Sequence, residues 1–108
     1  MELELLLLNN LLLIFSLLAM VKGRPFYTLH ANAILFEVSD DSYQPTYQLG
    51  DMLGAVQTSQ KNLGNMDVVI LEGKDRVREI KRILATKDNA LFLTPVTSCS
   101  LQDLYESL

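Results

Sequence analysis

The sequence predicts a small α/β domain that follows a hydrophobic N-terminal segment. Two observations predict this fold class. Short runs of branched and aromatic residues alternate along the chain with segments whose apolar residues recur at helical spacing. These runs are apolar throughout, which is typical of strands covered on both faces in a parallel sheet. The predicted order is β–α–β–α–β–α, a three-stranded, mostly parallel sheet with right-handed crossovers, and 108 residues suffice for one such domain.

The first 23 residues are predicted to form a hydrophobic helix that acts as a signal peptide. Residues 11–21 (LLLIFSLLAMV) have the length of a signal-peptide core, and the small residues Val21 and Gly23 favour cleavage after Gly23. Cleavage there would leave residues 24–108 as a single secreted domain. The sequence therefore predicts a secreted protein.

The charges around this segment favour an alternative, a single-pass membrane protein anchored by residues 5–21. Glu2 and Glu4 precede the apolar run, whereas Lys22 and Arg24 follow it. By the positive-inside bias, this arrangement keeps the body of the chain in the cytosol. Both possibilities remain open from the sequence.

Three segments of the body are predicted to be strands: residues 33–38 (AILFEV), 66–71 (MDVVIL) and 90–94 (ALFLT). Residues 26–31 are an alternative fourth strand. Turn-forming residues separate these runs, and Pro45 indicates that residues 43–48 form a loop or an edge.

Three further segments are predicted to be helices. In residues 49–60, apolar side chains recur at positions i, i+3, i+4 and i+7 (Leu49, Met52, Leu53, Val56). Residues 74–87 place Val77, Ile80, Ile83 and Leu84 on one helical face. A last helix is predicted to begin at Ser98 or Ser100, with an apolar face formed by Leu101, Leu104, Tyr105 and Leu108.

Acidic residues follow two of the predicted strands. Asp40 and Asp41 come after the first strand, and Glu72 follows the second. In a parallel sheet these ends meet at one edge, where carboxylates can hold a divalent cation such as Mg²⁺. The alternative is that the two aspartates are turn residues and Glu72 flanks a helix. No organic cofactor is predicted.

Basic residues cluster on the polar face of the predicted helix 74–87: Lys74, Arg78, Lys81 and Arg82. Such a face can contact an acidic partner or anionic lipid headgroups. It is equally the solvated face that every amphipathic helix needs.

The single cysteine, Cys99, excludes a disulfide within the chain. It is a candidate for a bridge to another chain, or a small buried apolar residue. Because a domain of this size has a thin core, we expect a protein partner or self-association. The net charge of −4 argues against nucleic-acid binding, which needs a strongly basic face.

No catalytic constellation or phosphate-binding loop stands out, which favours a protein without enzymatic activity, although a small enzyme that uses Asp40, Asp41 and Glu72 remains an alternative. Three functions remain open: a secreted binding or structural module, a membrane-tethered cytosolic regulatory domain with a basic helix face, and a metal-dependent acidic site at the strand ends. Because Leu108 ends the sequence within an apolar helical face, the chain could also be a truncated product or half of an obligate dimer.

Overall fold

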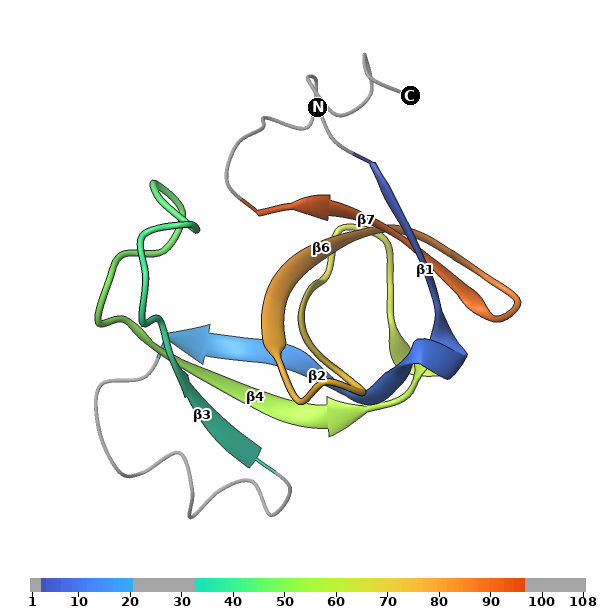
Figure 1. Ribbon diagram of the computed structural model, residues 1–108, viewed down its shortest axis with the longest axis horizontal. Coiled ribbons are helices and arrows are strands. Elements are labelled where there is room, and N and C mark those ends of the chain that lie inside the picture. Colours follow the sequence, from blue (N-terminus) through green and yellow to red (C-terminus); the bar gives the residue numbers. More distant parts are fainter. Residues whose placement is uncertain (1–2, 21–32, 97–108) are drawn as a thin grey trace.

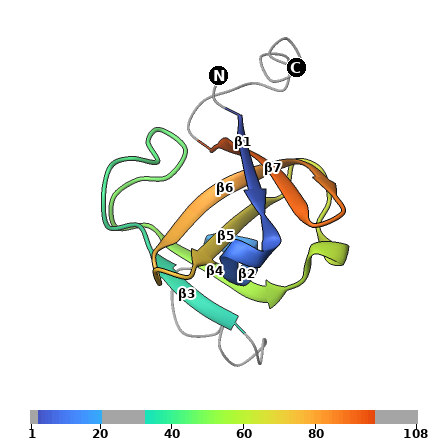
Figure 2. The same ribbon diagram turned by 45° about the vertical axis from the view of Figure 1, so that its right-hand side comes forward.

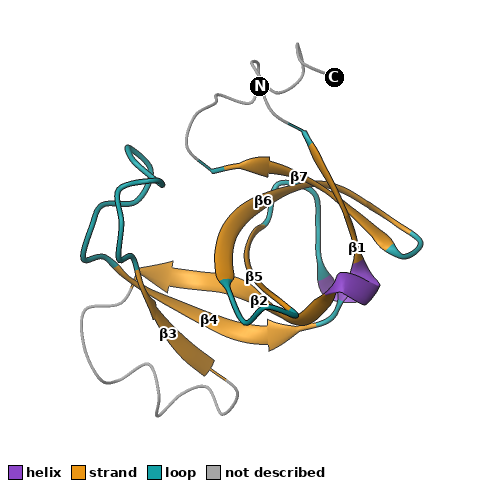
Figure 3. Ribbon diagram, in the orientation of Figure 1, coloured by secondary structure: helices purple, strands orange, loops and turns teal. Residues whose placement is uncertain are grey.

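Strands form nearly all the regular structure in the computed structural model, which describes residues 3–20 and 33–96 (Figure 1, Figure 3). The only helices in these two ranges are the three-residue 3₁₀ turns η1 (Leu8–Asn10) and η2 (Gln60–Asn62), so the described part has no helix with the length to cross a bilayer. The strands are β1 (Glu4–Leu7), β2 (Leu11–Met20), β3 (Ala33–Glu37), β4 (Met52–Thr58), β5 (Val68–Gly73), β6 (Arg78–Lys87) and β7 (Ala90–Pro95).

The seven strands form one sheet in the order β1-β7-β6-β5-β2-β4-β3, and every neighbouring pair is antiparallel. Strands β1 and β3 are therefore the two edges, and β2 lies between β5 and β4. The sheet is strongly curled, and β6 bends in an arc between β7 and β5 (Figure 1, Figure 2). Register shifts within β2 and β6 are β-bulges of the kind that increase such curvature.

The predicted α/β fold is wrong, because the described strands are all antiparallel and the predicted helices there are strands. Three of the predicted strands do exist, as β3, β5 and β7, and residues 43–48 form a loop. In β5 and β7 the continuous apolar character reflects burial on both faces in a curled antiparallel sheet rather than parallel pairing, whereas β3 is an edge strand that is only partly buried. Residues 26–31, the predicted last helix and Cys99 lie outside the described residues.

Strand β6 replaces the predicted helix 74–87, and its burial pattern explains the misleading helical spacing. Ile80 and Ile83 are both buried, but they point to opposite faces of the strand. Ile80 belongs to one apolar core and Ile83 to another. Since each face of β6 meets its own core, apolar residues need not alternate along it.

The same reason applies to the other two overturned helices. Strand β4 replaces the predicted helix 49–60: Leu53 and Ala55 share one buried face, and Leu49 precedes the strand and is exposed. Residues 1–23 were expected to form a hydrophobic helix, but residues 4–20 form β1, η1 and β2. At its centre, strand β2 buries Ile14 in one core and Phe15 in the other, so its apolar residues do not alternate with polar ones.

The two cores lie on opposite faces of the sheet. In β5, the side chain of Ile70 enters the first core, whereas its neighbours Val69 and Leu71 enter the second. Phe15 and Ile14 of β2 divide in the same way. The first core also contains Val38 and Tyr47 from the loop 38–51, where the Thr46 hydroxyl donates to the carbonyl of Val96 over 2.5 Å.

Candidate functional site

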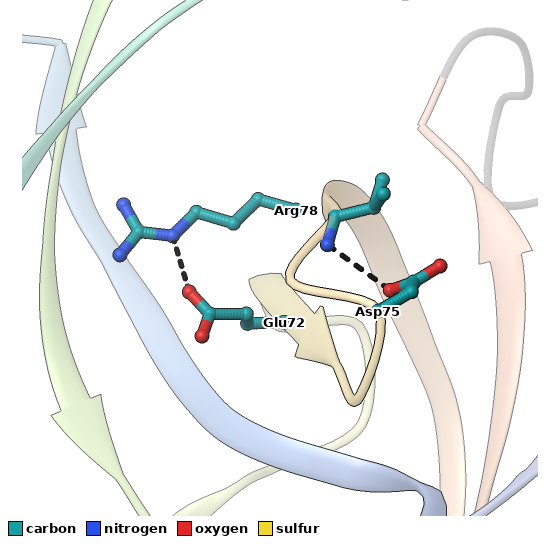
Figure 4. Close-up of polar contacts among 4 residues, drawn as sticks. Glu72, Asp75 and Arg78 are labelled. Carbon is teal, nitrogen blue, oxygen red and sulfur yellow. Dashed lines mark hydrogen bonds and ion pairs between the residues drawn. The ribbon is translucent and has the colours of Figure 1, made fainter.

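An ion pair between a buried carboxylate and a partly exposed guanidinium lies at the turn end of the β5–β6 hairpin. Glu72 and Arg78 are directly opposite each other in the two strands, and Arg78 Nε donates to Glu72 Oε1 over 2.8 Å. The Glu72 side chain is 7% exposed and that of Arg78 is 36% exposed. Figure 4 shows the two side chains pointing toward one another across the hairpin.

The Arg78 guanidinium also lies over the ring of Phe15, with Cζ 5.3 Å from the ring centroid. This distance is within the range of cation–π attraction. Phe15 is 3% exposed and belongs to the first core. The pair therefore covers one end of that core, and its geometry accounts for a structural role.

The turn that joins β5 to β6 is shaped by Asp75, whose Oδ1 accepts a hydrogen bond from the backbone N–H of Val77 over 3.0 Å (Figure 4). Arg76 in this turn has φ +67°, and its N–H donates to the carbonyl of Gly73 over 3.0 Å. Lys74 is exposed in the same turn. This turn sets the register that places Glu72 opposite Arg78.

The three acidic candidates for a metal site lie in two different environments. Asp40 is exposed in the loop after β3, where its carboxylate accepts hydrogen bonds from the hydroxyl and the backbone N–H of Ser42, and these hold the pKa of Asp40 below its usual value. Asp41 is exposed beside it, whereas Glu72 pairs with Arg78. Within residues 3–20 and 33–96, no three His, Cys, Asp or Glu side chains gather as metal ligands would.

The acidic candidates do not gather because the strands that carry or precede them run in opposite directions. Strands β3 and β5 are separated by β4 and β2, and each neighbouring pair is antiparallel, so β3 and β5 run in opposite directions. Their carboxyl ends therefore lie at opposite ends of the sheet. The expected meeting of strand ends required a parallel sheet.

The four basic candidates do not share a face, because the helix that would have aligned them is a strand. Along β6, Arg78 and Arg82 point to one face and Lys81 points to the other. Lys81 Nζ lies 3.3 Å from Glu4 Oε1, and Arg82 donates to the carbonyl of Met66 over 3.4 Å. Arg78, Lys81 and Arg82 thus each have a partner within the domain.

An open hollow of about 370 Å³ lies beside the first half of β6, and it brings Asp40 and Arg78 to the same depression. Tyr43 also lines it, and the Tyr43 hydroxyl accepts a hydrogen bond from the N–H of Ile80 over 3.2 Å. The lining carries both signs of charge, with Glu79 and Lys81 among its residues. These charges select neither an anion nor a cation.

Exposed leucines on the edge strand β1 and at the residue before it form an apolar row on the surface of the described residues. Leu3, Leu5 and Leu7 are 55%, 58% and 48% exposed, and they alternate with Glu4 and Leu6 on the other face. We call these three residues the leucine edge. Within the described residues, no strand pairs with the outer side of β1.

Sequence reasoning missed the leucine edge, because it assigned residues 1–23 to a helix in which no strand edge exists. The alternation of Glu2 and Glu4 with Leu3 and Leu5 was the available signal. The continuous leucines that follow obscured it.

Comparisons with protein families, with curated proteins and with solved structures gave no match to this chain.

Proposed function

We propose that the chain is a non-enzymatic binding module that takes up an extended, apolar segment along the leucine edge. The observation that carries this proposal is the exposure of Leu3, Leu5 and Leu7 in a row on an edge strand whose outer side is unpaired in the described residues. An edge strand offers a line of backbone donors and acceptors to an added strand, and alternate side chains provide specificity.

Two further features support strand addition at β1. The strand is four residues long and held in place by regular pairing with β7, from Glu4 opposite Leu93 to Leu7 opposite Ala90. In addition, Leu5 lies directly opposite Phe92, which is partly exposed, so the apolar surface continues from β1 onto β7. A rigid, apolar edge loses little conformational entropy when a ligand binds.

The test uses a synthetic nine-residue peptide in which leucine alternates with lysine, and a lysine–serine peptide as the control with equal charge. We expect the leucine peptide to cause saturable amide shifts at residues 3–7 in the NMR spectrum of the full chain. The lysine–serine peptide is expected to cause none there.

A proline substitution sharpens the test. Leu5→Pro removes the N–H donor of an edge residue, and edge strands tolerate proline where the lost N–H faces outward. We expect this variant to fold and to lose peptide binding, whereas Leu18→Lys, at an exposed leucine of β2, should retain it. Equal shifts in the wild type and in Leu5→Pro would disprove the proposal.

A further inference from the structure

We infer that the occupant of the leucine edge is β1 of a second copy of this chain, paired antiparallel about a two-fold axis at Leu5. This inference rests on the proposed function and names its ligand. It follows from the backbone directions in β1, from the register that keeps the apolar faces together, and from the position of the charges.

The backbone groups on the free side of β1 belong to the leucines themselves. The N–H of Leu8 donates to the carbonyl of Asn89 over 2.7 Å, one step beyond the pair of Leu7 with Ala90. Hydrogen-bonded pairs alternate along an antiparallel ladder, so Leu6 and Glu4 also point their backbone groups toward β7. The N–H and C=O groups of Leu3, Leu5 and Leu7 therefore point outward.

Only some registers join two such strands with matching faces. A two-fold axis perpendicular to the sheet keeps each face on its own side, so residues opposite one another must have the same parity. An axis at Leu5 places Leu5 opposite Leu5 of the second copy, and Leu3 opposite Leu7. This register brings all three leucines of each copy into contact and pairs all the outward backbone groups of residues 3–7.

The charges on β1 do not oppose this pairing. Glu4 would lie opposite Leu6 of the second copy, not opposite its counterpart Glu4. Its carboxylate is also held 3.3 Å from Lys81 Nζ within its own chain, on the other face from the leucines. The apolar face of the joined strands thus carries no charged residue between positions 3 and 7.

The size of the contact sets the strength of the expected dimer. Five residues from each copy are fewer than the roughly 20–30 a side of a standard stable interface. We therefore expect a reversible dimer whose population rises between about 10 μM and about 1 mM protein, in the range of weak, transient contacts. Sedimentation velocity of the full chain over this range measures it.

The variant Leu5→Lys places two like charges opposite each other at the axis, where like charges are destabilising. We expect it to remain monomeric throughout the range, with a circular dichroism spectrum like that of the wild type. Leu18→Lys, which adds the same charge at a leucine 47% exposed on β2, is expected to dimerise as the wild type does.

Cross-linking tests the register in a Cys99→Ser background. With Leu5→Cys, the two α-carbons at the axis would be about 5.5 Å apart, which is compatible with a disulfide. With Leu3→Cys, the two copies of the substituted residue would be separated by four residues along the strands, about 14 Å, and should not cross-link. Mixing Leu3→Cys with Leu7→Cys should restore cross-linking.

A dimer that Leu5→Lys abolishes, with cross-linking at position 5 but not at position 3, supports the inference. A monomer at 1 mM, or a dimer that survives Leu5→Lys, overturns it. If the chain stays monomeric but the leucine peptide still binds at residues 3–7, only the second-copy inference fails. If neither the peptide nor a second copy binds there, the proposed function fails as well.

Discussion

Substitution of Phe15 tests whether the hydrophobic N-terminal segment is a structural strand of the folded protein. Phe15 lies in β2 between β4 and β5, is 3% exposed, and has the Arg78 guanidinium over its ring. Truncating a buried phenylalanine to alanine removes its transfer free energy and leaves a cavity, at a cost of about 3–5 kcal/mol. We expect Phe15→Ala to lower the free energy of unfolding of the full chain by about this amount.

Urea denaturation followed by circular dichroism measures the effect, and Leu18→Ala is the matched control. Leu18 belongs to the same strand but is 47% exposed. We expect its substitution to change the free energy of unfolding by about 1 kcal/mol or less. If the two variants unfold at the same urea concentration as the wild type, Phe15 is not in the core and the strand assignment is refuted.

Deletion of residues 1–23 extends the test to the whole segment. Without β2, the pair β3–β4 has no connection through the sheet to β5, β6 and β7. Loss of the burial of Ile14 and Phe15 alone costs about 3–6 kcal/mol, against a typical domain stability of about 5–15 kcal/mol. We expect residues 24–108 alone to give a poorly dispersed NMR spectrum and no cooperative unfolding. A cooperative transition would refute this expectation.

Four further substitutions probe the polar groups of the domain by urea denaturation. Arg78→Ala leaves the buried Glu72 carboxylate without its cation. Because Arg78 is partly exposed, we expect the free energy of unfolding to fall by about 1–3 kcal/mol, more than in Glu72→Gln. A larger loss in Glu72→Gln would contradict the pairing. The hydroxyl of Thr94 is buried without a partner among the described residues, so Thr94→Val should raise the free energy of unfolding by about 1 kcal/mol. A lower free energy of unfolding would show that the hydroxyl is hydrogen-bonded in the folded protein. Burial raises the pKa of Tyr47, and the charge of Arg82 partly offsets this rise. The neutral phenol therefore contributes fully to the stability of the fold below its ordinary pKa of about 10, and this contribution is lost as the pH rises through the raised pKa. Tyr47→Phe should therefore lose less stability than the wild type above about pH 10, and parallel pH profiles would refute this assignment.

Strand positions could be predicted from the sequence where branched residues form short runs between turn residues. This was sufficient for β3, β5 and β7. It was not sufficient for β6, because Ile80 and Ile83 enter different cores and their spacing imitates a helix. The two-residue turn at Asp88 and Asn89, between Lys87 and Ala90, was the available sign of a hairpin.

The candidate site was predictable only in its parts. Glu72 and Arg78 were both singled out, but as members of different sites, one acidic and one basic. Their pairing depends on a hairpin register that the predicted helix 74–87 excluded. The leucine edge was missed for a related reason: the alternation of glutamate and leucine at its start indicates a strand, but an edge is recognised only once the order of strands in the sheet is known.

The property that makes residues 11–20 suitable as the central strand β2 also makes them resemble a leader. A strand covered on both faces must be apolar on both, and such a run has the composition of a signal-peptide core. Moreover, the partners of β2 begin at residues 52 and 68, so its contacts are long-range and form late. Until they form, the segment is an exposed apolar run, and we expect folding of the sheet to compete with capture of this run by a membrane.

This competition predicts the effect of a substitution outside the segment. Leu53 of β4 is completely buried in the first core, so Leu53→Ala should weaken the sheet by about 2–5 kcal/mol without changing residues 1–23. In eukaryotic cells we expect this variant to shift protein toward the membrane pellet, or toward a chain that begins at Arg24. The exposed Leu49→Ala serves as control. If Leu53→Ala and Leu49→Ala leave the same distribution, folding of the sheet does not decide the fate of the segment.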